Sequence, residues 1–214
     1  MRKKVSESVI NRLPRYYRYL TELDAGNVER ISSRELSRRM HVTASQIRQD
    51  LNCFGGFGQQ GYGYNVKFLK ESIEKILGLD RGYRAVLVGA GNMGRTFAIN
   101  TKFESRGFKL IGIFDSDPKK YGMTIASHKV MPFDKIHSFI EENKPQMAIL
   151  DVPKTAAHEV AEKLVSYGIK AFMNFSYTEL STADDIAVEN VHLGDSLMRL
   201  SYKLAEKQNN SENE

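Results

Sequence analysis

The chain has 214 residues, of which 41% are hydrophobic and 27% are charged, a composition typical of globular domains rather than of disordered or fibrous chains. No apolar run approaches the roughly 18 residues that a membrane span needs, and the basic start at residues 1–4 lacks the apolar segment of a signal peptide, so we expect a cytoplasmic protein without a membrane partner. Cys53 is the only cysteine, which excludes an intrachain disulfide and fits a reducing compartment.

The formal net charge of +5 lies entirely in the first third of the chain. Residues 1–64 hold 11 Lys and Arg against 6 Asp and Glu, whereas residues 65–214 hold 20 of each kind. Nine of the 11 cations are Arg, whose guanidinium group forks onto phosphates and guanine edges. A basic module joined to a neutral one is typical of nucleic-acid binding, although charge alone fits a solvated basic face equally well.

A helix-turn-helix is predicted inside the basic segment. Two capping-box patterns, Ser32-Ser-Arg-Glu35 and Thr43-Ala-Ser-Gln46, predict helices over 32–40 and 43–54. They are joined by a tight turn at His41-Val42, which is the spacing of that motif. We therefore expect the second helix to lie in the major groove of DNA, although any small helical bundle could share the pattern.

Two further helices flank this motif. The first is predicted from Leu13, with Pro14 in the first turn, where its missing N–H costs nothing, and it carries apolar residues at helical spacing as far as Leu23. The second is predicted from Asn65, which has the type of an N-cap, to Leu77.

A glycine-rich segment separates the recognition helix from the next one. Residues 55–64 contain five glycines in ten positions, which favours a tight hairpin over a helix because glycine adopts positive φ freely. A hairpin in this place is the wing of a winged helix, while a plain linker is the alternative. We predict DNA contacts from the motif, the wing and the start of the first helix, through Arg12, Ser45, Gln46, Arg48, Gln49, Gly58, Gly61, Tyr62 and Gly63.

A Rossmann domain is predicted to follow. A strand over 83–88 runs into Gly89-Ala-Gly-Asn-Met-Gly94 and a helix, and a second strand over 109–114 ends at Asp115, 21 residues after Gly94. A glycine motif between a strand and a helix, with an acid at that distance, is typical of dinucleotide binding.

Each part of this fingerprint has an expected role. Gly89 makes a tight turn, Gly91 lets the backbone approach a pyrophosphate, and Gly94 lets the helix pack on the strand. Asp115 would bind the adenosine ribose and repel a 2′-phosphate, which favours NAD(H) over NADP(H), although a strand-end turn residue is the simpler alternative. The predicted cofactor-binding residues are Gly89, Ala90, Gly91, Asn92, Met93, Gly94, Asp115, Val152 and Pro153.

The remaining chain continues the alternation of strands and helices. Strands over 147–150 and 169–174 flank a helix over 155–167, which indicates a parallel sheet. Asp195 is predicted to cap a terminal helix whose broad apolar face needs a second surface, such as a partner subunit. The polar tail over 208–214 is expected to be disordered.

Several short motifs follow one another along the chain: Leu13-Pro-Arg-Tyr-Tyr-Arg-Tyr-Leu20, Ser32-Ser-Arg-Glu-Leu36, Ile47-Arg-Gln-Asp50, Phe54-Gly-Gly56, Gly61-Tyr-Gly-Tyr-Asn65, Gly89-Ala-Gly-Asn-Met-Gly94, Gly168-Ile-Lys170 and Asn174-Phe175. In combination, they closely resemble the Rex family of redox-sensing transcriptional repressors over essentially the whole chain. The resemblance implies a homodimer that binds double-stranded operator DNA, represses genes of fermentation or respiration, and is released by NADH much more than by NAD⁺. It also implies a C-terminal helix swapped onto the partner.

The expected architecture is therefore α/β: a winged-helix DNA-binding domain and a Rossmann NAD(H)-binding domain with a domain-swapped C-terminal helix. The expected ranges are 1–80, 81–193 and 194–207, followed by the tail. Some positions depart from common family patterns, which leaves the operator sequence and the discrimination of NADH open. They are Gln49, Tyr177, His192 and Leu193.

Two alternatives were weighed against this interpretation. An NAD-dependent oxidoreductase with an accessory DNA-binding domain is disfavoured because the chain has no room for a substrate domain, and because its histidines are scattered at 41, 128, 137, 158 and 192. That scatter predicts neither a catalytic residue nor a metal site. A Rossmann domain for another nucleotide, such as CoA, is disfavoured by Asp115.

Overall fold

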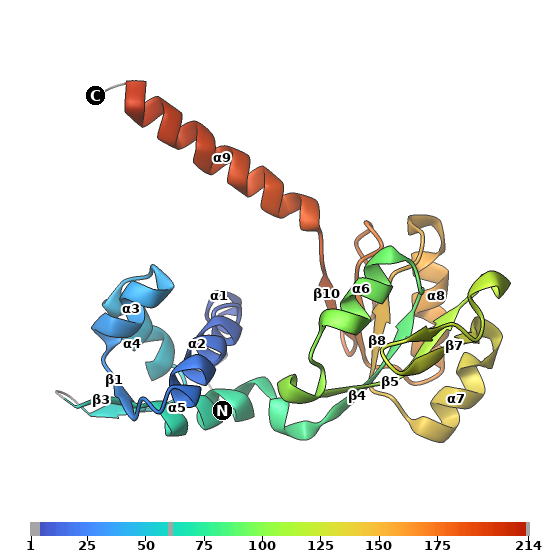
Figure 1. Cartoon of the computed structure of the whole chain (residues 1–214), viewed down its shortest axis with the longest axis horizontal. Helices are drawn as coiled ribbons and strands as arrows, with labels where there is room; N and C mark the ends of the chain where they lie inside the picture. Colours follow the sequence, from blue (N-terminus) through green and yellow to red (C-terminus); the bar gives the residue numbers. More distant parts are fainter. Residues whose placement is uncertain (1–4, 60–61, 213–214) are drawn as a thin grey trace. The chain divides into compact units, whose positions relative to one another are not determined.

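The computed structural model describes residues 5–59 and 62–212, which divide into two compact units with the boundary between Arg81 and Gly82. The first unit is mostly helical and the second is built on a parallel sheet (Figure 1). Within these described ranges, we find no helix with the length and apolar character that crossing a bilayer requires.

The helix-turn-helix is present in the first unit. Helix α3 (Ser33–Met40) begins with a complete capping box between Ser32 and Glu35, as predicted. Helix α4 (Ala44–Asn52) begins after Thr43, whose hydroxyl accepts from the Gln46 amide at 3.1 Å. The second capping box is only half right, because the Gln46 side chain donates to a carboxylate of its own helix instead of returning to the Thr43 backbone.

The other elements of this unit complete a winged helix. Strands β1 (Arg30–Ile31), β3 (Gly63–Asn65) and β2 (Gly58–Gln59) form an antiparallel sheet in that order, so the predicted hairpin is confirmed. Helix α2 (Leu13–Ala25) packs against α5 (Val66–Leu77). A short α1 (Glu7–Ile10) precedes them. The buried core includes Leu13, Tyr16, Leu20, Leu36, Ile47, Leu51, Leu69 and Ile73.

The second unit is a seven-stranded sheet in the order β10-β9-β8-β4-β5-β7-β6, parallel except for the β6–β7 pair. The order reverses beside β4, because the chain adds β5 and β7 on one side of it before crossing to β8 on the other. Ligands of open parallel sheets bind outside the carboxyl ends of the strands at such a reversal. The strands are β4 (Tyr83–Val88), β5 (Phe108–Asp115), β6 (Thr124–Ile125), β7 (His128–Pro132), β8 (Met147–Leu150), β9 (Ala171–Asn174) and β10 (Ala187–Asn190).

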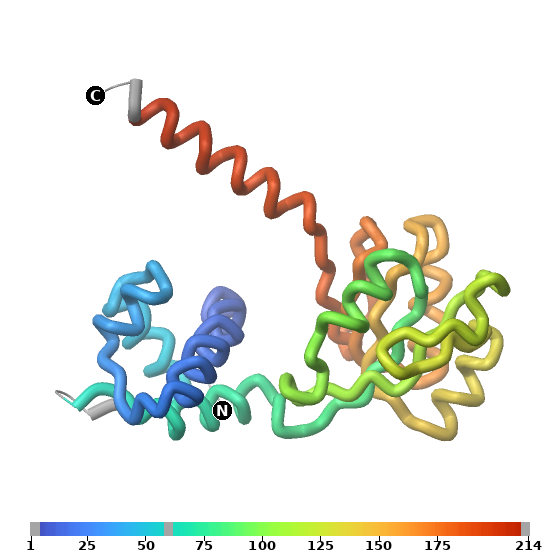
Figure 2. The backbone as a smooth tube through the Cα atoms, in the orientation of Figure 1, coloured from blue at the N-terminus to red at the C-terminus, as the bar shows by residue number. Residues whose placement is uncertain are grey.

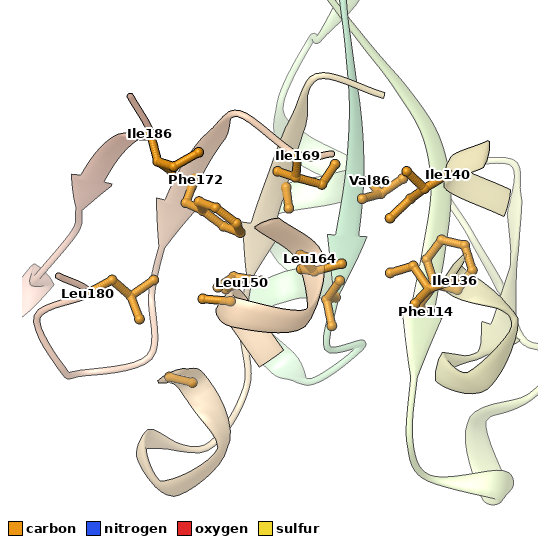
Figure 3. Close-up of a cluster of buried hydrophobic side chains, with 14 residues drawn as sticks. Val86, Phe114, Ile136, Ile140, Leu150, Leu164, Ile169, Phe172, Leu180 and Ile186 are labelled. Carbon is orange, nitrogen blue, oxygen red and sulfur yellow. The ribbon is translucent and has the colours of Figure 1, made fainter. Parts of the chain in front are cut away.

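Helices cover the two faces of this sheet unequally. On one face α7 (Ile136–Asn143) and α8 (Lys154–Ser166) bury Ile136, Ile140 and Leu164 against Val86, Phe114, Leu150 and Phe172 (Figure 3). On the other face a second apolar cluster includes Ala98 of α6 (Asn92–Asn100) with Leu87 and Ile113. An apolar groove of about 450 Å³ lies beside it, lined by residues of β4, β8, β9 and β10.

The C-terminal helix α9 runs without interruption from Leu193 to Glu212 (Figure 2). Its start makes Asp195 a first-turn residue rather than the predicted cap, where its charge still favours the helix N-terminus. The predicted disordered tail is wrong for residues 208–212, because extending an existing helix costs little per residue; residues 213–214 lie outside the described ranges.

Candidate functional site

A cleft of about 600 Å³ lies at the carboxyl ends of β4, β5 and β8, where the strand order reverses. Its volume falls within the range of small-molecule and cofactor sites. All the predicted cofactor residues line it except Ala90 and Gly94, which lie buried behind the surface. The cleft is also lined by residues that lie outside the predicted fingerprint, among them Lys120, Asp151, Lys154 and Ser176.

The glycines of the loop between β4 and α6 are required by close packing. Gly89 has a φ of +98°, and a Cβ there would lie 2.0 Å from the carbonyl oxygen of Asp151. A Cβ on Gly94 would lie 2.3 Å from the Gly89 carbonyl oxygen, which confirms the predicted tight turn and helix packing. The loop is therefore held against the end of β8 with no room for a side chain at Gly89 or Gly94.

The N-terminus of α6 faces this cleft through Asn92 and Met93. The amide of Gly94, in the same first turn, donates to Asp151 Oδ2 at 2.6 Å. Gly91 is the N-cap residue and has no side chain with which to cap the helix. A carboxylate from the neighbouring strand end thus satisfies one of the amides that a helix N-terminus leaves without an intrahelical partner.

Asp115 ends β5 as predicted and is only 6% exposed. Its oxygens accept from the Ala90 amide at 2.7 Å, the Asp117 amide at 2.8 Å and Lys120 Nζ at 2.9 Å. Burial opposes ionisation of this carboxyl group, but the hydrogen bond from Lys120 and those from the two amides together hold its pKa below the ordinary value. Asp115 is therefore a carboxylate with part of its acceptor capacity still open.

A polar network begins at the far wall of the cleft. Buried Asn174 accepts from the Ser176 hydroxyl at 2.5 Å and donates to Asn190 Oδ1 at 2.8 Å. Asn190 in turn donates to Glu179, whose other oxygen lies 2.9 Å from His192 Nε2. His192 is thus a hydrogen-bonded histidine immediately before α9, rather than a free side chain in the cleft.

The exposed face of α4 carries a polar stripe. Ser45, Arg48, Gln49 and Asn52 are all exposed and lie three or four residues apart, so they share one side of the helix. Ile47 and Leu51 are buried on the opposite side. Arg48 also donates to Ser33 Oγ at 3.0 Å. The structure brings the predicted base-reading positions together, apart from Gln46, and Asn52 lies on the same side of the helix, beyond them.

The side chains of Arg12 and Gln46 donate hydrogen bonds to a buried carboxylate. The guanidinium of Arg12 forks onto Asp50 at 2.7 and 2.8 Å, Gln46 donates to it at 2.8 Å, and the Tyr16 hydroxyl donates at 2.8 Å. Asp50 is 0% exposed. Burial opposes its ionisation, but the hydrogen bonds from Arg12, Gln46 and Tyr16 hold its pKa below the ordinary value. This network fixes α4 to α2 and was not foreseen.

The wing is shaped by packing and by one cation. Gly63 has a φ of +69°, and a Cβ there would lie 2.6 Å from the Ile31 carbonyl oxygen. A glycine is therefore required at this position for β3 to pack closely against β1. Tyr62 is 69% exposed, and the Arg30 guanidinium lies 5.9 Å from its ring centre. Gly58 lies in β2, whereas Gly61 is outside the described residues.

One chain thus contains a basic winged helix and a Rossmann cleft with an acid at the second strand end. This combination defines a DNA-binding protein with a dinucleotide-type ligand domain. Two family models match these units: "Putative DNA-binding protein N-terminus" over residues 4–52 and "CoA binding domain" over 80–178. Among residues 5–59 and 62–212, no three His, Cys, Asp or Glu side chains gather as a metal site would require.

The chain belongs to the Rex family of redox-sensing transcriptional repressors. It is 55% identical to the Rex protein of Thermoanaerobacter pseudethanolicus over 96% of this chain and 92% of that protein. It is 52% identical to the Rex protein of Clostridium beijerinckii over 96% and 98%. These relatives are named as repressors rather than enzymes, which supports the first interpretation over an oxidoreductase.

Solved structures agree with this assignment. The crystal structure of RSP in complex with β-NAD⁺ and operator DNA matches with a TM-score of 0.89 and 52% identity, covering 98% of this chain and 97% of that chain. The complex of RSP with β-NADH matches with the same TM-score and 48% identity, covering 99% and 100%. The predicted fold, a winged helix joined to a Rossmann domain, is confirmed.

Proposed function

We propose that this protein represses transcription by binding operator DNA and that NADH in the Rossmann cleft releases it. The observation that carries the proposal is the presence of both sites in one chain: an exposed polar stripe on a capped recognition helix, and a cleft with a glycine loop and a buried carboxylate. The related RSP is described with NAD⁺ together with operator DNA, and separately with NADH.

The cleft fits an NAD(H) molecule in several respects. The open acceptor positions of Asp115 suit the hydroxyls of an adenosine ribose, and its charge disfavours a 2′-phosphate. The first turn of α6 offers backbone amides to a pyrophosphate, while Val152 and Pro153 provide apolar wall. The same residues argue against CoA as the ligand, because the 3′-phosphate of CoA would lie near the ribose acid.

The DNA surface combines base-reading and phosphate-binding groups. Ser45, Arg48 and Gln49 are exposed near the start of α4, from which they would reach base edges. Arg30 and Tyr62 lie on the wing side, where a cation and exposed amides suit the phosphate backbone. Arg12 acts mainly by holding α4 in place, with its remaining N–H groups free for phosphate.

A homodimer would cover the exposed apolar surface of the second unit and would pair the recognition helices of the two subunits. Leu197, Met198, Leu200, Tyr202 and Leu204 of α9 are each more than half exposed, which is costly for a monomer. The groove of about 450 Å³ on the thinly covered sheet face, lined by residues such as Phe97, Phe103, Met147 and Met173, suits the α9 of a partner. Two recognition helices would then read two half-sites. A protein that binds operator DNA in this way would work in the cytoplasm.

The proposal is tested by titrating operator binding with each cofactor. A ligand shifts an equilibrium only by its difference in affinity for the two states. We expect NADH to weaken binding of a fluorescent operator far more than NAD⁺ does at equal saturation of the cleft, measured by fluorescence anisotropy. Equal effects of the two cofactors would contradict redox sensing. Failure of the cofactor-free protein to bind operator DNA would contradict the proposal that it is a repressor.

A further inference from the structure

The carboxylate of Asp151 lies in the phosphate-binding loop. Its Oδ2 accepts from the Gly94 amide at 2.6 Å and lies 3.1 Å from the point where a Cβ on Gly91 would stand. Gly91 is the position whose missing side chain leaves space for a pyrophosphate in dinucleotide-binding loops. In this protein that space borders a negatively charged group supplied by the next strand.

Asp151 differs from Asp115 in its partners, because Asp115 is balanced by Lys120. Asp117, which lies in the same cleft, accepts from the Lys119 amide at 3.0 Å and caps a separate turn. Within residues 5–59 and 62–212, no ion pair joins Asp151 to a lysine, arginine or histidine. Its side chain accepts from an amide of the helix terminus, the same kind of donor that a phosphate group would take.

We propose that Asp151 is an internal competitor of the cofactor pyrophosphate and sets the affinity of the cleft for dinucleotides. The inference rests on the proposed function of the cleft. In the free protein the carboxylate caps α6, which stabilises the helix N-terminus. A pyrophosphate that approaches the loop must displace this anion from the Gly94 amide or bind beside it, and either course costs binding free energy.

The pyrophosphate is common to NADH, NAD⁺ and ADP-ribose, so the competition acts on all three alike. Asp151 therefore lowers the affinity of the cleft without altering the preference between the reduced and oxidised cofactor. Its consequence is a repressor that responds at a higher total concentration of dinucleotide, with an unchanged response to the ratio of the two forms.

The test measures binding of ADP-ribose, NADH and NAD⁺ by isothermal titration to the full-length protein and to Asp151→Asn and Asp151→Ala. The worth of one hydrogen bond to a charged group predicts about a tenfold gain in affinity, shared by the three ligands. Thermal unfolding of the free protein provides a second measurement. Asp151→Ala lowers the melting temperature because the cap is lost, whereas Asp151→Asn keeps an acceptor and lowers it less.

Asp134→Asn is the control, because it removes one exposed negative charge next to Phe133, which lines the cleft, without touching the glycine loop or Asp115. We expect less than about a threefold change there, since screening by water weakens a more distant charge. Weaker binding of all three ligands to Asp151→Asn would overturn the proposal and make Asp151 a cofactor ligand. A gain for NADH paired with a loss for NAD⁺ would also overturn it, because the nicotinamide charge would then be what Asp151 senses.

Two further outcomes are informative. If the wild-type affinity rises with Mg²⁺ and falls with EDTA, and the variants lose this dependence, Asp151 binds a bridging cation and the proposal fails. If neither the wild-type protein nor any variant binds ADP-ribose, the proposed function of the cleft fails instead. Binding by the wild type with unchanged affinity in both variants contradicts the competition alone.

Discussion

Asp50 and Asp115 are both buried carboxylates with lowered pKa values, yet their surroundings differ. Asp50 receives four hydrogen bonds, all from side chains, and has no acceptor capacity left for another molecule. Asp115 receives two of its three bonds from backbone amides and lies at the wall of a cleft. A saturated carboxylate holds helices together, whereas an incompletely paired one beside a cavity can take a ligand.

Removing the saturated carboxylate should have the largest effect. Asp50→Ala leaves the Arg12 charge and the Tyr16 hydroxyl without their partner, and breaking a buried ion pair in this way costs about 3–5 kcal/mol. We expect the free energy of unfolding of the winged-helix unit to fall by that amount, measured by urea denaturation, with operator binding lost alongside. Gln46→Ala removes one neutral donor and should cost only about 1 kcal/mol.

The same network predicts a pH dependence. Because the pKa of Asp50 is lowered in the folded state, its contribution to stability is present above the unfolded pKa of about 3.9 and is lost as the pH falls through the folded value. Unfolding measured between pH 6 and pH 3 should show this loss at the acid end. A wild-type curve as flat as that of Asp50→Asn would contradict it.

Removing the incompletely paired carboxylate should affect binding instead. Asp115→Ala is expected to weaken NADH binding about 10- to 100-fold, the worth of a hydrogen bond to a charged acceptor. It also frees Lys120, whose ammonium group then lies where a 2′-phosphate would come, so discrimination against NADPH should relax. Isothermal titration with both cofactors measures this, and Asp115→Ala combined with Lys120→Ala should lose the NADPH gain.

The contrast between these two aspartates also shows which site residues can be predicted from the sequence. Asp115 was predictable because its role depends on local order, a strand end at a fixed distance from a glycine loop. Asp50 was not, because Arg12 and Tyr16 lie 38 and 34 residues earlier in the chain, and only packing shows that Arg12 faces inward. Asp151 follows a predicted strand, but nothing in its spacing indicates that its side chain turns into the loop.

Some of the missed elements have a similar cause. Strands β1 and β6 are two residues long, and β10 has only exposed and half-buried residues, so none of them shows a hydrophobic period. They form because a neighbouring strand offers unpaired backbone groups. The capped helices and the long buried strands β4 and β5, in contrast, carry their signals within the segment itself.

A substitution at Gln49 tests whether the polar stripe of α4, which the Asp50 network holds in position, reads DNA bases. Gln pairs with adenine, whereas Lys prefers guanine, so Gln49→Lys should shift one operator position toward G by about 1–3 kcal/mol. It should also raise the overall affinity and steepen its salt dependence. Selection from randomised operators measures the preference, and Asn52→Lys, one turn further along, is the control for added charge. A gain in affinity with no new base preference would make Gln49 a positioning residue.

The smallest expected effect lies in the wing, where Arg30 and Tyr62 interact outside any buried network. An exposed cation–π contact is worth about 0.5–1 kcal/mol, and it orients the Arg30 guanidinium, which also donates to the Tyr62 carbonyl at 3.3 Å. Tyr62→Leu should therefore weaken operator binding about two- to fivefold, whereas Tyr62→Phe keeps the aromatic face and should bind like the wild type. Anisotropy titrations at two salt concentrations separate the contribution of Arg30 from that of the Tyr62 ring. A lost phosphate contact from Arg30 lowers the slope of log affinity against log salt concentration by about one. If Tyr62→Phe weakens binding as much as Tyr62→Leu does, the Tyr62 hydroxyl contacts the DNA. The wing then contacts the DNA backbone through this hydroxyl, and Arg30 only holds the tyrosine in place.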